Sequence, residues 1–216
     1  MRMRVSARHL GAWGMVLGSA LSATALRAAE LTDRLMAPGL FAADGEGLAR
    51  PQDLLRYSHM RRLNGQIPDK VTEGTVALLH DMTTRTLALQ VAESDRPARI
   101  VADFPETAPN PVLMFFLENI VRATAAQTGG SPFYIRNRIR EALAASTGGT
   151  ITNGQAQVTI RPFIADVQAA RMGPFAKLSL TLVYDIDRPD RILDLLADTG
   201  PGPDAYTERL HLVGGL

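Results

Sequence analysis

The most regular pattern along the chain is an alternation of apolar and polar residues between positions 177 and 186. Its apolar members are Leu178, Leu180, Leu182, Tyr184 and Ile186. A period of two residues is typical of a β-strand with one buried face. Similar patterns predict a hairpin of two strands at 71–80 and 87–92, turned by residues 81–85. Less regular strands are predicted at 55–63, 99–104, 151–163 and 206–213.

The middle of the chain has the period and the end signals of an α-helix. Asn110-Pro111 is typical of an N-cap followed by proline at the first helical position. The helix should run to about Gln127 and end before Gly129-Gly130. Its apolar side chains fill an arc of about 200°, which is wide enough for burial on more than one side. Phe115 lies on the polar side of this helix and breaks the pattern.

Ser131-Pro132 repeats the start signal and predicts a second helix that ends near Ser146. A short third helix is predicted at 189–197, with Asp187 as its N-cap. An order of strands, two helices and strands is typical of an α+β fold rather than of a repeated strand–helix–strand unit. We therefore predict an antiparallel β-sheet packed around or against a central helical hairpin.

The N-terminus has the features of a secretory signal peptide. Arg2, Arg4 and Arg8 precede an uncharged stretch at 10–26, and Ala23-Thr24-Ala25 offers a cleavage site. Glycine and serine residues dilute this stretch, so it is weak for a membrane span, although an uncleaved anchor is the alternative. The predicted organisation is a signal peptide at 1–29, an irregular lead-in at 30–53 and a single α+β domain at 54–216. The mature protein is expected to be periplasmic or secreted in a Gram-negative bacterium, with no integral membrane span.

The composition of the chain excludes several classes of site and partner. The absence of cysteine excludes a disulfide scaffold, a thiolate zinc site and a catalytic cysteine. The chain of 216 residues has a net charge of +1, but residues 1–29 hold four arginines and no acid. Their loss leaves 19 basic and 22 acidic side chains, a net charge of −3. We therefore predict no nucleic-acid partner for the mature protein.

The sequence carries no recognisable catalytic motif. It contains no G-x-S-x-G nucleophile turn, no glycine-rich nucleotide loop and no H-E-x-x-H pair. We predict neither a metal nor a cofactor. The alternative is a hydrolase that uses strand-borne His and Asp side chains, which requires His59, His80 or His211 within hydrogen-bond reach of an acid in a cleft.

Two groups of residues are candidates for ligand binding. Met114, Phe115, Phe116 and Leu117 could line a cavity that accepts a lipid or an acyl chain, the alternative being a packed core. Tyr134, Arg136 and Arg140 could hold a phosphate or sulfate, the alternative being arginine stems that border a buried stripe.

We therefore expect an exported, soluble cell-envelope protein without catalytic function that binds an apolar small molecule or an envelope protein. A third possibility is a structural or assembly partner in the envelope, which would present an exposed apolar patch. A sheet around a helical element resembles exported lipoprotein carriers and other bacterial periplasmic binding folds. This resemblance is one of predicted architecture, which by itself fixes no function.

Overall fold

A computed structural model describes residues 33–41, 52–65, 70–146 and 149–215. The predicted signal peptide at 1–29 lies outside these residues, as does most of the lead-in. Residues 33–41 of the lead-in contribute Leu35 and Phe41 to the hydrophobic core. Arg34 of the same segment donates a hydrogen bond from Nη1 to the carbonyl oxygen of Ile186 (3.2 Å).

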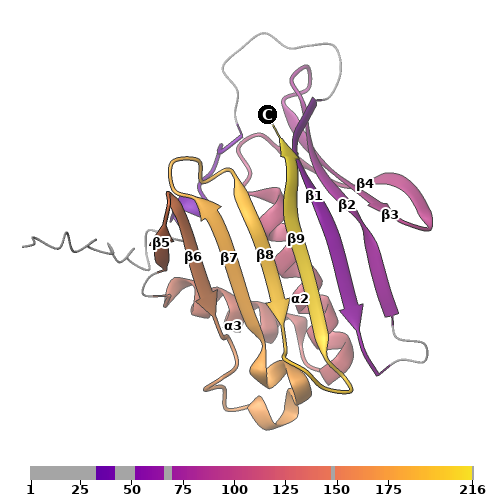
Figure 1. Cartoon of the computed structure of the whole chain (residues 1–216), viewed down its shortest axis with the longest axis vertical. Coiled ribbons are helices and arrows are strands. Elements are labelled where there is room, and N and C mark those ends of the chain that lie inside the picture. Colours follow the sequence, from indigo (N-terminus) through magenta and orange to yellow (C-terminus); the bar gives the residue numbers. More distant parts are fainter. Residues whose placement is uncertain (1–32, 42–51, 66–69, 147–148, 216) are drawn as a thin grey trace, which may run out of the picture.

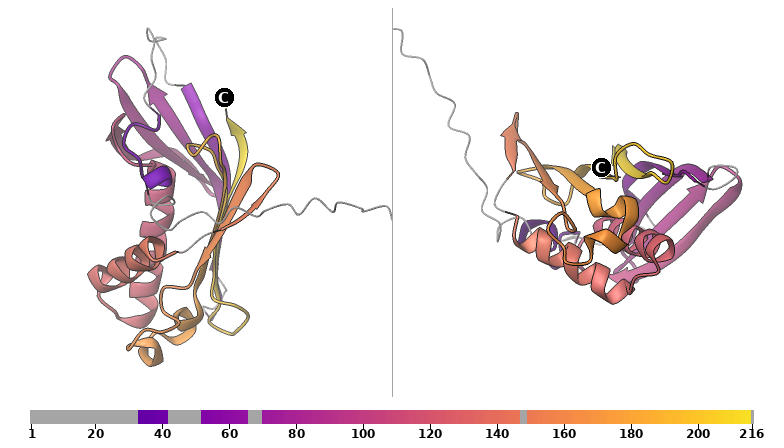
Figure 2. Two further views of the ribbon diagram at one scale, coloured as in Figure 1. Left: turned by 90° about the vertical axis from the view of Figure 1, so that its left-hand side faces the viewer. Right: turned by 90° about the horizontal axis from the view of Figure 1, so that it is seen from below.

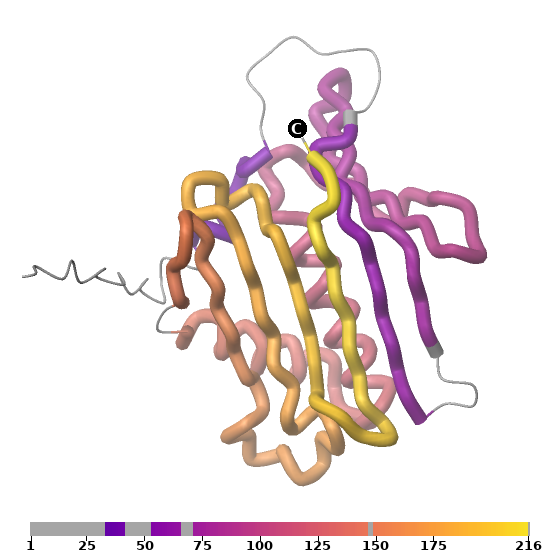
Figure 3. The backbone as a smooth tube through the Cα atoms, in the orientation of Figure 1, coloured from indigo at the N-terminus to yellow at the C-terminus, as the bar shows by residue number. Residues whose placement is uncertain are grey.

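Nine strands of the described residues form one antiparallel sheet (Figure 1). They are β1 (Gln52–Leu63), β2 (Lys70–Asp81), β3 (Thr86–Glu93), β4 (Arg96–Pro105), β5 (Thr150–Thr152), β6 (Gln155–Ile160), β7 (Ser179–Asp185), β8 (Ile192–Asp198) and β9 (Tyr206–Gly215). Their order in the sheet is β4-β3-β2-β1-β9-β8-β7-β6-β5. The first and the last strand therefore pair in the middle of the sheet, where Figure 3 shows them side by side.

The helices are α2 (Pro111–Thr128), α3 (Pro132–Ala144) and the short 3₁₀ turns η1 (Ala169–Arg171) and η2 (Gly173–Lys177). Figure 2 shows α2 and α3 on the same face of the sheet, and no described helix covers the other face. The prediction of an antiparallel sheet accompanied by a few helices is confirmed. No helix in the described ranges combines the length and the apolar content that a membrane-spanning helix needs.

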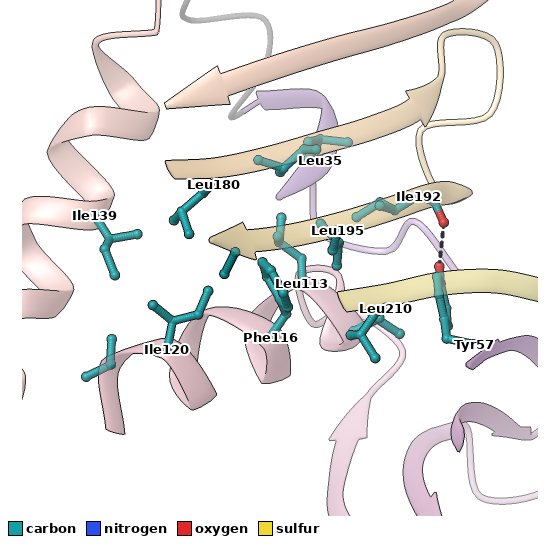
Figure 4. Packing of buried hydrophobic residues seen from close by; sticks show 14 of the residues in the cluster. Leu35, Tyr57, Leu113, Phe116, Ile120, Ile139, Leu180, Ile192, Leu195 and Leu210 are labelled. Atoms are coloured by element: carbon teal, nitrogen blue, oxygen red, sulfur yellow. Dashed lines mark hydrogen bonds between the residues drawn. The ribbon is translucent and has the colours of Figure 1, made fainter. Parts of the chain in front are cut away.

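The core lies between the sheet and α2. One row of buried side chains crosses the register of β6, β7, β8 and β9 in the order Val158, Leu182, Leu195 and Leu210. Phe116 and Ile120 of α2 are fully buried against this part of the sheet (Figure 4). Tyr57 is also fully buried and donates its hydroxyl to the Ile192 carbonyl oxygen (2.9 Å).

The predicted helix at 189–197 is wrong, because this segment forms β8. A bulge explains the error: Tyr184 pairs with Ile192 and Val183 pairs with Asp194, so Leu193 is an extra residue. The bulge interrupts the alternation, and the apolar residues at 192, 195 and 196 then have the spacing of a helix. Since no helix begins there, Asp187 is not an N-cap; its backbone N–H instead donates to Asp185 Oδ1 (3.0 Å).

The strand predicted at 151–163 is in fact two strands, because residues 150–160 form the hairpin of β5 and β6; the alternation of Val158 and Ile160 with polar residues belongs to β6. Its two turn residues, Asn153 and Gly154, have φ values of 51° and 77°. Positive φ at both positions is the geometry of a type I′ turn, for which Asn-Gly is the preferred sequence. The Asn153-Gly154 pair is therefore the sequence signal for this turn.

The predicted start of α2 is confirmed, and we expect its N-cap to stabilise the folded protein. Asn110 Oδ1 accepts hydrogen bonds from the backbone N–H groups of Val112 (3.1 Å) and Leu113 (3.2 Å). Ser131 occupies the same position before α3 but makes no side-chain capping bond. We expect Asn110→Ala to lower the free energy of unfolding by about 1 to 2 kcal/mol and Ser131→Ala by less than about 0.5 kcal/mol. Urea denaturation measures both values, and equal losses would contradict the assignment of the cap.

Candidate functional site

The face of the sheet opposite α2 contains a hollow of about 350 Å³. We call it the ionic hollow. It is lined by Gln155, Val183, Arg191, Leu193, Asp194, Arg209, His211 and Leu212. Arg209 and His211 are exposed and alternate with buried residues of β9, so their side chains point away from the helices. The ladder between β8 and β9 ends at the pair Asp194–His211, and the hollow lies where the two strands part.

Asp194 organises the charged side chains of the ionic hollow. Its Oδ1 accepts a hydrogen bond from Arg209 Nε (2.8 Å) and lies 3.3 Å from His211 Nδ1. The hydrogen bond to Asp194 raises the pKa of Arg209. The side chain of Asp194 is 19% exposed, whereas those of Arg209 and His211 are about half exposed. The Asp194 carboxylate is therefore hydrogen-bonded at the base of the hollow, while the side chains of Arg209 and His211 are in contact with solvent.

Arg191 is the second guanidinium of the ionic hollow. Its backbone is fixed by the turn between β7 and β8, in which Arg191 N–H donates to the Arg188 carbonyl oxygen (2.8 Å). The nearby Asp190 is bound by Arg188, whose Nη2 lies 2.9 Å from Asp190 Oδ2. Arg191 Nε is buried and has no hydrogen-bond partner among the described residues. A buried donor without a partner is costly, and a ligand in the hollow cannot reach this N–H as the structure stands.

The three histidines considered for catalysis lie apart, each beside a different acid. His59 Nε2 is 2.8 Å from Glu208 Oε1, and His80 Nε2 is 2.7 Å from Glu106 Oε1. Both of these pairs are buried, whereas the third histidine, in the ionic hollow, is exposed. The ionic hollow is thus the place where a histidine, an acid and an open surface coincide.

The pair of His59 and Glu208 belongs to a buried polar cluster between the sheet and α2. Glu208 also accepts hydrogen bonds from Asn119 Nδ2 (2.9 Å) and from the Tyr206 hydroxyl. Burial, together with the adjacent Glu208, raises the pKa of Tyr206 well above its ordinary value, so the phenol keeps its proton and donates it. The ring of Phe115 packs edge-on against His59, with 6.1 Å between the ring centres. The cluster therefore joins α2 to β1 and β9.

The second buried pair joins the end of β2 to the segment that leads into α2. The hydrogen bond from His80, assisted by Arg85, holds the pKa of Glu106 below its ordinary value. Arg85 Nη2 lies 2.7 Å from Glu106 Oε2, with a side chain that is largely exposed. Each oxygen of the Glu106 carboxylate thus has its own cationic or hydrogen-bonding neighbour, and neither is directed toward the ionic hollow.

The structure does not bring the seven predicted site residues together. Phe116 is fully buried in the core, Leu117 packs partly against it, and Met114 is exposed. On the second group, the Tyr134 hydroxyl donates to Asp166 Oδ1 (2.6 Å). Arg136 donates to Glu118 (2.9 Å) and Arg140 donates to Asn137 (3.1 Å). With Phe115 on His59, these residues are distributed over the core, two flanks of α2 and the surface of α3.

Sequence reasoning missed the two arginines of the ionic hollow. Arg209 and His211 lie two residues apart on a strand that was predicted at 206–213, which places them on one face. The pattern at 189–197 predicts a helix that contains Asp194, and this prediction does not place Asp194 beside Arg209 and His211. The sequence signal for this site is the alternation of residues at 207–211. It shows which side chains share a face of β9, but not which strand lies beside them.

The chemistry of the ionic hollow favours binding. Two guanidinium groups face one carboxylate, and Val183, Leu193 and Leu212 supply apolar surface. Ser58 lies opposite His211 in the register of β1 and β9, but its hydroxyl donates to the His211 carbonyl oxygen (3.3 Å) rather than to the imidazole. Neither a protein-family model nor a curated protein sequence matches this chain.

Proposed function

We propose that the protein is exported to the cell envelope and acts there as a non-catalytic binding protein. Its ligand is a small organic anion with a short apolar part, bound in the ionic hollow. The observation that carries this proposal is the pair of guanidinium groups, those of Arg191 and Arg209, which line the hollow together with a single acid among its described lining residues, Asp194. An anionic oxygen of the ligand would accept hydrogen bonds from these guanidinium groups.

The charges of the hollow favour an anion over a cation. Arg191 and Arg209 contribute two positive charges, while Asp194 is the one acid among the described lining residues and already has Arg209 as a partner. The volume of about 350 Å³ lies at the lower end of the range for small-molecule sites. The apolar part of the ligand would contact Val183 and Leu193, which retains the apolar ligand of the sequence-based expectation in a different place.

Export is supported by the N-terminal pattern of three arginines, an uncharged stretch and small residues at 1–29. A periplasmic or secreted protein meets small metabolites directly, and a surface hollow gives them access without a conformational change. The intact mass of protein recovered from the periplasm of cells expressing the full chain tests this part of the proposal. Loss of about the first 25 to 29 residues is the expected result, and an intact N-terminus would contradict it.

Binding can be tested by isothermal titration calorimetry with hexanoate, using 1-hexanol as an uncharged ligand of the same chain length. We expect hexanoate to bind in the millimolar range, since about eight heavy atoms at a surface hollow contribute about 3 to 4 kcal/mol. Arg191→Gln should weaken this binding about tenfold, because a charge-assisted hydrogen bond contributes about 1.5 kcal/mol or more. Hexanol should bind less tightly than hexanoate.

The matched control is Arg56→Gln. Arg56 is a partly exposed arginine of the same sheet that pairs with Asp53 and does not line the ionic hollow. Its replacement should leave hexanoate affinity unchanged. Equal affinity of hexanoate and hexanol, or equal losses for the two arginine variants, would rule out the hollow as an anion site.

A further inference from the structure

Three large apolar side chains are exposed together at one end of the molecule. Phe133 at the start of α3 is 70% exposed, and Ile164 and Val167 in the loop after β6 are 65% and 91% exposed. We call these three residues the end patch. Figures 1 and 2 show the start of α3 and this loop side by side at the lower end of the long axis, next to η1 and η2.

The end patch is held in place by a carboxylate that is itself buried. Asp166, between Ile164 and Val167, accepts hydrogen bonds from the Tyr134 hydroxyl (2.6 Å), Arg138 Nε (2.7 Å) and the backbone N–H of Gln168 (2.7 Å). Burial alone would raise the pKa of Asp166, but these hydrogen bonds outweigh it and hold the pKa below its ordinary value. The loop is therefore fastened to α3, and the apolar side chains are presented on a fixed support.

The segment that carries Ile164 and Val167 has only basic charged side chains on its surface. Between positions 161 and 178 the chain has three bases, Arg161, Arg171 and Lys177, and all three are exposed. The single acid of this segment is Asp166, whose side chain is fully buried. Without residues 1–29 the chain has a net negative charge. The segment 161–178 differs from it, because its exposed charges are positive.

We propose that the end patch docks on an anionic membrane surface as a peripheral contact. Phe133, Ile164 and Val167 would enter the interface between headgroups and acyl chains, and the surrounding bases would face the lipid phosphates. A membrane fits better than a second protein, since three side chains at a narrow end bury less area than the roughly 1,200 Å² that a specific protein interface needs. This inference uses a surface separate from the ionic hollow and does not depend on the proposed ligand.

Vesicle cosedimentation of the purified protein tests the proposal. The vesicles contain phosphatidylethanolamine and phosphatidylglycerol at 3:1, and vesicles of phosphatidylcholine alone are the uncharged comparison. We expect binding to the anionic vesicles that falls severalfold when NaCl is raised to about 0.5 M, because salt screens the basic side chains. The double variant Ile164→Ser/Val167→Ser should bind about tenfold more weakly, since it removes two inserting side chains.

The matched control is the double variant Ile100→Ser/Val213→Ser, which replaces two exposed apolar residues of β4 and β9 away from the end patch. It should bind like the wild-type protein. Equal binding to both kinds of vesicle, or equal losses for the two double variants, would overturn the proposal. So would a dimer in analytical ultracentrifugation that Ile164→Ser/Val167→Ser abolishes while vesicle binding is absent, because the patch would then contact a second copy. Hexanoate affinity serves as a separate readout that these variants should not change.

Discussion

Replacing Glu208 with alanine is expected to lower the free energy of unfolding by about 3 to 5 kcal/mol. The carboxyl group has no exposed surface, and it accepts hydrogen bonds from His59, Asn119 and Tyr206. Its removal leaves three donors without an acceptor in a site that water does not reach. The loss should exceed that of an ordinary large-to-small change, because desolvated donors are added to the lost packing.

Urea denaturation of Glu208→Ala and Glu73→Ala measures this effect. Glu73 is an exposed glutamate of β2 in the same sheet, and its replacement should cost less than about 0.5 kcal/mol. Glu208→Gln is informative as well, since it keeps one acceptor oxygen and should fall between the two. A loss below about 1 kcal/mol for Glu208→Ala would mean that the cluster contributes little to holding α2 on the sheet.

Phe116→Ala should be destabilising to a similar extent, by about 3 to 5 kcal/mol. The ring is fully buried between α2 and the sheet, near Leu113 and Ile120 and facing the strands that carry Leu195 and Leu210. Alanine removes the apolar surface of the ring and leaves a cavity, because the sheet and the helix are fixed by many other contacts and close only partly around it. Thermal unfolding and urea denaturation both report this change.

Met114→Ala on the same helix is the matched control. Met114 is 37% exposed and therefore loses less buried surface than the fully buried Phe116, and the change should stay within about 1 kcal/mol. Similar losses for the two variants would show that Phe116 is not packed as described.

Local signals predicted the elements that depend on neighbouring residues. The N-cap at Asn110 and the proline that follows it specify the start of α2 through contacts within three positions. The hairpin of β2 and β3 is equally local, since Leu79 and Ala88 pair across a short turn. In both cases the residues that decide the structure lie close together in the sequence, which is why pattern and propensity sufficed.

The ionic hollow could not be predicted in the same way. Arg209 and Asp194 are 15 positions apart, and their contact depends on the register of β8 against β9. A bulge at Leu193 in the pairing of β8 with β7 also gives β8 the apolar spacing of a helix. The site thus depends on which strands are neighbours and on a one-residue bulge. The alternation of apolar and polar residues within one strand predicts neither of them.

The central pairing of β1 with β9 has a consequence for how the chain reaches this structure. The strands β1 to β4 follow one another along the chain, and so do β5 to β9, so each half can pair locally. The two halves join through residues such as His59 and Glu208, which are 149 positions apart. Contacts of such separation form late, because closing a long loop is entropically costly. The core therefore stays incomplete until the last strand has been synthesised.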